Sequence, residues 1–277
     1  MTVPATITVG ISGTPRDRAV LDHAVRECAA RGTRLHILHA APAPIMAPTD
    51  IEQAEFDRAL RRATARRMAT DALRYARHLD PELTVSMAVD QHRPYRALID
   101  AAEHSVLIVV GQSRRPMGTA ERVATAVHCP VIVVPPTVGD SVGVLVGLDE
   151  GGLAADALEF ACEEARLRHW PLSVVHVVVP ALVAVGSHRA DESAHVLAEP
   201  LTRCAARYPD LRITPHALHG NPSEVLCELT ASAGLLVVGT HGRGVLGELL
   251  LGSVSRALIH SARCPVAVVR PTGAATP

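Results

Sequence analysis

The sequence contains no lysine, so all 27 of its Lys and Arg positions are arginine. This absence excludes a Walker A loop, which places a lysine on the phosphates, and any mechanism that runs through a lysine Schiff base. Aromatic residues make up only 2% of the 277 residues, which argues against a surface of stacked rings for single-stranded nucleic acid. The 27 basic and 28 acidic residues nearly balance, so charge gives no reason to expect nucleic acid or an acidic membrane as a partner.

Long apolar stretches are also missing. A membrane helix needs roughly 20 apolar residues, and the longest candidate, 172–185, is interrupted by His176 and Pro180. The N-terminal residues lack the basic and then apolar pattern of a signal peptide. The six cysteines form no C-x-x-C pair and lie in apolar segments, as small buried residues do. We therefore expect a cytoplasmic protein with reduced thiols and no membrane segment.

The chain repeats itself after about half its length. The segment 7–11 (ITVGI) recurs 137 residues later as 144–148 (VLVGL). The segment 129–134 (CPVIVV) recurs as 264–269 (CPVAVV). Pro, Gly and small polar residues at 135–141 indicate a linker between the copies. Collinear matches of this kind predict two copies of one domain.

Within each copy, short β-branched apolar runs alternate with helical segments, which is typical of a parallel sheet covered on both faces. We predict an α/β fold of two tandem, doubly wound domains, 1–137 and 142–277. Each is expected to be a five-stranded parallel sheet flanked by helices, including a long helix over 50–80 and one beginning at Asn221. The strands are expected near 7–11, 35–40, 83–89, 106–110 and 131–134, and near 144–148, 172–179, 211–218, 235–239 and 266–269. Such sheets bind ligands beyond the carboxyl ends of their strands, where the strand order reverses.

A glycine-rich motif follows the fourth predicted strand of the second copy. Gly239 ends that strand, Gly242 follows after two residues, and Gly252 and Ser253 follow after nine more, directly before a predicted helix. Glycines let the backbone approach a ligand closely, and a helix start offers unpaired N–H groups and a partial positive charge to phosphate. Asp149 ends the first strand of the same copy, where a carboxylate can accept hydrogen bonds from a ribose hydroxyl or an adenine amine.

This pattern resembles the ATP-binding universal stress proteins, whose motif is G-x2-G-x9-G-[S/T] beside an aspartate after the first strand. The resemblance covers both copies and implies five-stranded α/β domains in a cytoplasmic protein. By position, Asp149 and Val177 would contact the nucleoside. The ribose and phosphates would be lined by Gly239, His241, Gly242, Gly252, Ser253 and Val254.

The resemblance implies ATP as the ligand, with or without Mg²⁺, and a sensing or regulatory role in the stress response. It also implies a regulatory protein partner and a homodimer formed through edge strands. We expect neither catalytic residues nor protein ligands to a metal, and slow hydrolysis of ATP stays open.

The first copy departs from the motif. Its corresponding loop, 111–119, is six residues shorter, with Arg114 in place of the second glycine. Ser12 stands where the second copy has Asp149. We therefore expect that the first copy does not bind ATP in the family's manner.

Other interpretations account for some of the same residues. The glycines can serve only to turn the chain, and the protein would then be a nucleotide-free interaction module that dimerises through the apolar strands in 129–134 and 264–269. The stretch 242–247 satisfies G-x-G-x-x-G but does not follow a first strand, which argues against a dinucleotide. The fifteen histidines show no metal-site spacing, and we expect His39 and His176 to share a packing or hydrogen-bonding role.

Overall fold

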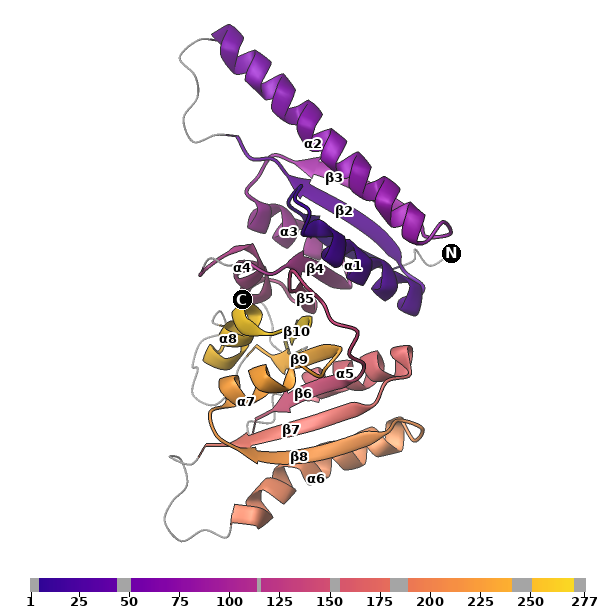
Figure 1. Cartoon of the computed structure of the whole chain (residues 1–277), viewed down its shortest axis with the longest axis vertical. Helices are drawn as coiled ribbons and strands as arrows, with labels where there is room; N and C mark the ends of the chain where they lie inside the picture. The colour runs from indigo at the N-terminus through magenta and orange to yellow at the C-terminus, as the bar shows by residue number, and fades with distance from the viewer. Residues whose placement is uncertain are drawn as a thin grey trace. The chain divides into compact units, whose positions relative to one another are not determined.

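The computed structural model describes residues 5–43, 51–113, 116–149, 155–179, 189–240 and 251–271, with the backbone only for Ile51 and 189–196 (Figure 1). The chain divides into two compact units, Met1–Cys129 and Pro130–Pro277. The predicted domains, 1–137 and 142–277, stay a prediction. The contacts place 131–134 in the second unit because this strand pairs with the last strand of the chain.

The first unit is a parallel sheet whose strands alternate with helices along the chain. Its strands lie in the order β3–β2–β1–β4, and all three pairings between neighbours are parallel. Helix α1 ends at Gly32, whose left-handed backbone (φ 63°) suits a residue without a Cβ. The elements are β1 (Thr6–Ile11), α1 (Asp17–Arg31), β2 (Arg34–Ala40), α2 (Ile51–Leu79), β3 (Val85–Asp90), α3 (Pro94–Ala102), β4 (Leu107–Gly111) and α4 (Thr119–Ala126).

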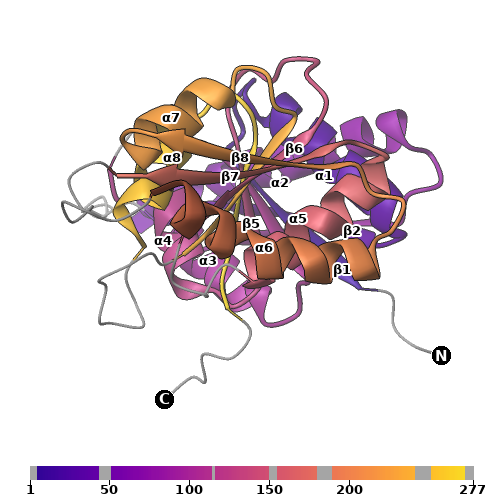
Figure 2. The same cartoon turned by 90° about the horizontal axis from the view of Figure 1, so that it is seen from below.

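The second unit repeats this arrangement and adds two strands, β10 and β5, beyond β9. Its strands lie in the order β5–β10–β9–β6–β7–β8. Figure 2 shows α5 and α6 on one side of β7 and β8, and α7 and α8 on the other. The elements are β5 (Val131–Val134), β6 (Val144–Leu148), α5 (Ala155–Arg168), β7 (Leu172–Val178), α6 (Arg189–Arg207), β8 (Ile213–His219), α7 (Pro222–Leu229), β9 (Leu235–Gly239), α8 (Ser253–Ser261) and β10 (Val266–Val269).

Local sequence explains the individual elements. The central strands are runs of β-branched and leucine side chains that are buried on both faces, as in 235–238 of β9. Helix α7 begins as predicted, because the side chain of Asn221 accepts a hydrogen bond from the backbone N–H of Ser223 at 3.0 Å and Pro222 occupies the first helical position.

The α/β prediction is confirmed, and each predicted strand is present with ends that agree within about two residues. One pairing departs from the expected parallel arrangement: β5 runs antiparallel to β10, with Val133 opposite Val266. Because β10 also pairs with β9, its two hydrogen-bonding edges are both occupied within the second unit. Among the described helices, none combines the length and apolar character needed to cross a bilayer.

Candidate functional site

The strand order of the second unit reverses between β6 and β9. From β6 the chain proceeds to β7 and β8 on one side, and then returns to β9 and β10 on the other. Strands β6 and β9 are parallel neighbours, with Val146 opposite Val237. Continuing this register places Asp149 beside the end of β9. In doubly wound sheets, the crevice at such a point is where ligands bind.

Asp149 brings a carboxylate to this point at the edge of the sheet. Its Oδ2 atom is buried and accepts no hydrogen bond from any residue that the structure describes. A buried polar atom without a partner destabilises the folded state by roughly 1–3 kcal/mol. Such atoms are rare in native proteins and call for a specific explanation. A ligand that donates a hydrogen bond to Oδ2 would provide this explanation.

A histidine holds the backbone that carries Asp149. The Nδ1–H of His176, on β7, donates to the carbonyl oxygen of Leu148 at 3.1 Å, and the imidazole is buried. In the first unit, the Nδ1–H of His39 donates to the carbonyl oxygen of Ile11 at 3.2 Å. The prediction that the two histidines share a hydrogen-bonding role is therefore confirmed.

The start of α8 is joined to the end of β9. The backbone N–H of Gly252 donates to the carbonyl oxygen of Thr240 at 2.8 Å, and the hydroxyl of Ser255 donates to that of Gly239 at 2.6 Å. Helix α8 begins at Ser253, whose side chain is exposed. The amide groups of the first helical turn therefore lie at the same edge of the sheet as the end of β9.

Six of the eight predicted site residues lie in described ranges, and the elements that carry them end or begin at the carboxyl edge of the second sheet. These residues are Asp149, Val177, Gly239, Gly252, Ser253 and Val254. His241 and Gly242, together with Arg114 of the first copy, lie outside the described residues. Thr240 and Ser255 were not among the predicted site residues. Both fall within or directly after the glycine motif, which is the only signal that could have found them.

The described residues of this site offer neither a metal cluster nor a reactive thiol. The described residues contain no group of three His, Cys, Asp or Glu side chains that could hold a metal ion. Burial raises the pKa of Cys28 and Cys129 to about 11 and that of Cys264 to about 12. These three thiols therefore stay protonated at neutral pH.

Comparison with known proteins decides the family. Two tandem segments, residues 5–135 and 143–270, match the model of the universal stress protein family. The chain belongs to this family. A universal stress protein of Mycobacterium tuberculosis strain H37Rv is 29% identical over 286 residues, which cover 95% of this chain and 96% of the relative.

A solved structure of a universal stress protein shares the fold over nearly the whole chain. The crystal structure of one from Archaeoglobus fulgidus covers 96% of each chain, with a TM-score of 0.73 and 18% sequence identity. A shorter universal stress protein from the same organism, solved in complex with dAMP, covers 48% of this chain, with a TM-score of 0.37 and 19% identity.

The first unit of this universal stress protein fills the corresponding positions with its own carboxylates. Asp17 accepts hydrogen bonds from the backbone N–H groups of 12–14, at 2.6–3.1 Å, and from the hydroxyl of Ser12 at 2.8 Å. Glu121, in the first turn of α4, accepts a hydrogen bond from the backbone N–H of Met117, which precedes the helix, at 2.7 Å. The carboxyl end of β1 and the approach to α4 therefore already hold internal anions.

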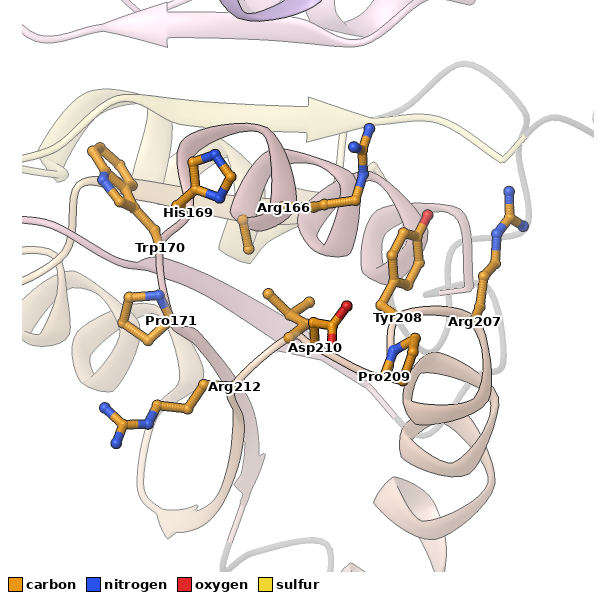
Figure 3. Close-up of a pocket in the computed structure, with 11 residues that line it drawn as sticks. Arg166, His169, Trp170, Pro171, Arg207, Tyr208, Pro209, Asp210 and Arg212 are labelled. Atoms are coloured by element: carbon orange, nitrogen blue, oxygen red, sulfur yellow. The ribbon is translucent and has the colours of Figure 1, made fainter.

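A cavity of about 490 Å³ lies elsewhere in the second unit, beside the amino ends of β7 and β8 (Figure 3). Its walls include Trp170, Arg207 and Tyr208. The Tyr208 hydroxyl donates to Glu159 at 2.6 Å, and the Arg207 guanidinium lies 3.1 Å from the same carboxylate oxygen. None of the predicted site residues lines this cavity, so its size alone does not make it the candidate site.

Proposed function

We propose that this universal stress protein binds an adenine nucleotide at the carboxyl edge of its second unit, with ATP as the ligand. The observation that carries the proposal is the Oδ2 atom of Asp149, which is buried at the reversal point of the sheet without a donor from the described residues. A ribose hydroxyl or an adenine amine supplies the missing donor. The free energy lost by burying this oxygen in the empty protein is then recovered on binding.

Backbone groups would bind the phosphates. The chain has no lysine, so no ammonium group can take this role. The glycine motif and the first turn of α8 offer N–H groups and a partial positive charge instead, and Ser253 adds a hydroxyl. Where Mg²⁺ accompanies ATP, the phosphates would be its main ligands.

The corresponding cellular role is that of a nucleotide-dependent sensor or regulator in the stress response. Bound nucleotide would connect the ends of β6, β7 and β9 with the start of α8, and so change a surface presented to a regulatory protein. We assign no catalytic residue to this protein. We expect it to be located in the cytoplasm.

The alternative is a nucleotide-free interaction module that dimerises through the apolar strands in 129–134 and 264–269. It has less support, because these two strands, β5 and β10, pair with each other in one chain. The remaining edge of β10 is taken by β9. A homodimer would therefore need another edge or surface, such as that of β8.

Calorimetric titration with ATP tests the proposal. We compare the wild type with Asp149→Ala, with Asp149→Ala combined with Gly242→Arg, and with Ser12→Ala as the matched control at the corresponding position of the first unit. Losing a hydrogen bond to a charged group removes about 1.5–3 kcal/mol, so Asp149→Ala should weaken binding by roughly 10-fold to 150-fold. The double variant should bind no measurable ATP, and Ser12→Ala should bind as the wild type does.

Two results would overturn the proposal. One is the absence of ATP binding by the folded wild type, and the other is an affinity that Asp149→Ala leaves unchanged. Thermal unfolding of each variant without ligand shows whether it is folded. Since Asp149→Ala removes the buried Oδ2 atom, which has no donor among the described residues, it should leave the stability of the ligand-free protein unchanged or increase it.

A further inference from the structure

A second cavity, of about 370 Å³, lies in the first unit and is lined by four arginines. It is located where β2 and β3 end, beneath the first half of α2, which extends past the carboxyl ends of these strands in Figure 1. The arginines are Arg58, Arg61, Arg62 and Arg66, and the other described residues of the walls are Ala41, Ala43, Val89 and Gln91.

The helical repeat of α2 explains why arginines face this cavity. Ala65, Ala69 and Ala76 form a buried stripe where α2 packs on the sheet. Arg58 and Arg62 precede Ala65 and Ala69 by seven residues each, which is two helical turns, so they continue the same stripe. The stripe thus changes from alanine to arginine where the strands beneath the helix come to an end.

Among the described residues, these arginines have no acidic partner, whereas Arg67 and Arg74 of the same helix do. Arg67 lies 4.0 Å from Asp71, and Arg74 also contacts Asp71. By contrast, none of the four guanidinium groups at the cavity forms a hydrogen bond or ion pair with a residue that the structure describes. Several positive charges around one cavity raise the local potential and attract a ligand of dense negative charge.

We propose that this cavity, here called the arginine cavity, binds a small molecule that carries two or more phosphate groups. Guanidinium groups present paired N–H donors that match phosphate oxygens, and they stay charged at all physiological pH values. The volume is within the range of small-molecule sites. Among the described residues, the other walls are small apolar side chains and one amide, Gln91, and these residues offer neither an aromatic ring nor a carboxylate for a nucleoside. The site therefore recognises phosphates, and it is separate from the nucleotide site proposed in the second unit.

Inorganic tripolyphosphate is the probe, because it has clustered phosphates and no nucleoside. We titrate it calorimetrically into the full-length wild type, into Arg58→Gln with Arg62→Gln, and into Arg67→Gln with Arg74→Gln as the matched control. Glutamine has nearly the helix propensity of arginine, so both double variants should fold, and circular dichroism checks this. We expect tripolyphosphate to bind the wild type with an affinity that falls as salt is added. Arg58→Gln with Arg62→Gln should lower this affinity by about tenfold or more. Arg67→Gln with Arg74→Gln should change it by less than about twofold.

The outcomes separate this proposal from its competitors and from the proposed function. Asp149→Ala should leave tripolyphosphate binding unchanged, whether or not ATP binds in the second unit. Equal losses of affinity for tripolyphosphate in the two double variants would mean that net charge alone attracts the probe. This result would overturn the proposal. So would an affinity for tripolyphosphate that Arg58→Gln with Arg62→Gln leaves unchanged. Failure of tripolyphosphate to bind, while an acidic peptide or duplex DNA binds through Arg58 and Arg62, would overturn it in favour of a macromolecular partner.

Discussion

The thiols of Cys162 and Cys204 provide a quantitative test of how α5 packs against α6. Their Sγ atoms lie 3.1 Å apart, and both side chains are buried. The sulfur atoms of a disulfide are about 2.05 Å apart, so a movement of about 1 Å brings these two to bonding distance. We expect mild oxidation with hydrogen peroxide to join Cys162 to Cys204.

The hydrogen bond between the two thiols determines which one reacts first. Cys162 donates to Cys204, and this bond raises the pKa of Cys162 and lowers that of Cys204. The Cys204 thiolate therefore attacks peroxide to form a sulfenic acid and hydroxide. The Cys162 thiol then attacks that sulfur and water leaves, so two thiols become a disulfide while peroxide is reduced to water. Because the thiolate is the nucleophile, the rate should rise with pH.

The gain in stability follows from the length of the closed loop. The two cysteines are 42 positions apart. Closing a loop of this length removes unfolded-state entropy equivalent to about 4 kcal/mol, and strain in the folded state reduces the gain to about 2–4 kcal/mol. With an m-value of about 2 kcal/mol/M, the urea midpoint of the second unit should rise by roughly 1–2 M.

Urea denaturation of the reduced and oxidised protein measures this shift, and intact mass and peptide mapping identify the bond. Cys162→Ser, treated identically, is the control for oxidation at other sites and should show no increase in midpoint. An oxidised wild type that contains the Cys162–Cys204 bond but unfolds at the reduced midpoint would refute the reasoning. A disulfide from Cys162 to a different cysteine would contradict the packing itself.

Three further predictions concern the second unit. Gly234→Ala should lower the free energy of unfolding by about 1–3 kcal/mol in urea denaturation, because the added Cβ would clash with the ring of Trp170. Gly139→Ala, with nothing within 4 Å of the added Cβ, is the control and should have little effect. Tyr208→Phe should lower the free energy of unfolding by about 1 kcal/mol, because it removes the 2.6 Å hydrogen bond to Glu159. An unchanged urea midpoint would contradict this prediction. Burial and that hydrogen bond raise the pKa of Tyr208 from 10.0 to about 12, so its stabilising effect is complete below pH 10 and is lost between pH 10 and 12. Tyr208→Phe should flatten this part of the curve of stability against pH.

The sequence alone determined the features that depend on local pattern. Continuous apolar runs such as 235–239 predicted the strands, because a strand buried on both faces needs no polar alternation. Asn221 predicted the start of α7, because capping involves only residues within one helical turn. The internal repeat predicted two α/β domains, and the spacing of the glycine motif located the candidate site at the end of β9.

Only the tertiary structure decided how distant segments meet. The antiparallel pairing of β5 with β10 joins strands more than a hundred residues apart, and no local propensity encodes its direction. The sequence suggested Asp149 as a ligand, but only the fold buries its Oδ2 atom without a donor from the described residues. The arginine cavity likewise exists because β2 and β3 end beneath α2, which turns a charged stretch of helix into the wall of a site. Burial and partner choice depend on the packing of whole elements against one another, and so they become visible only once the chain is folded.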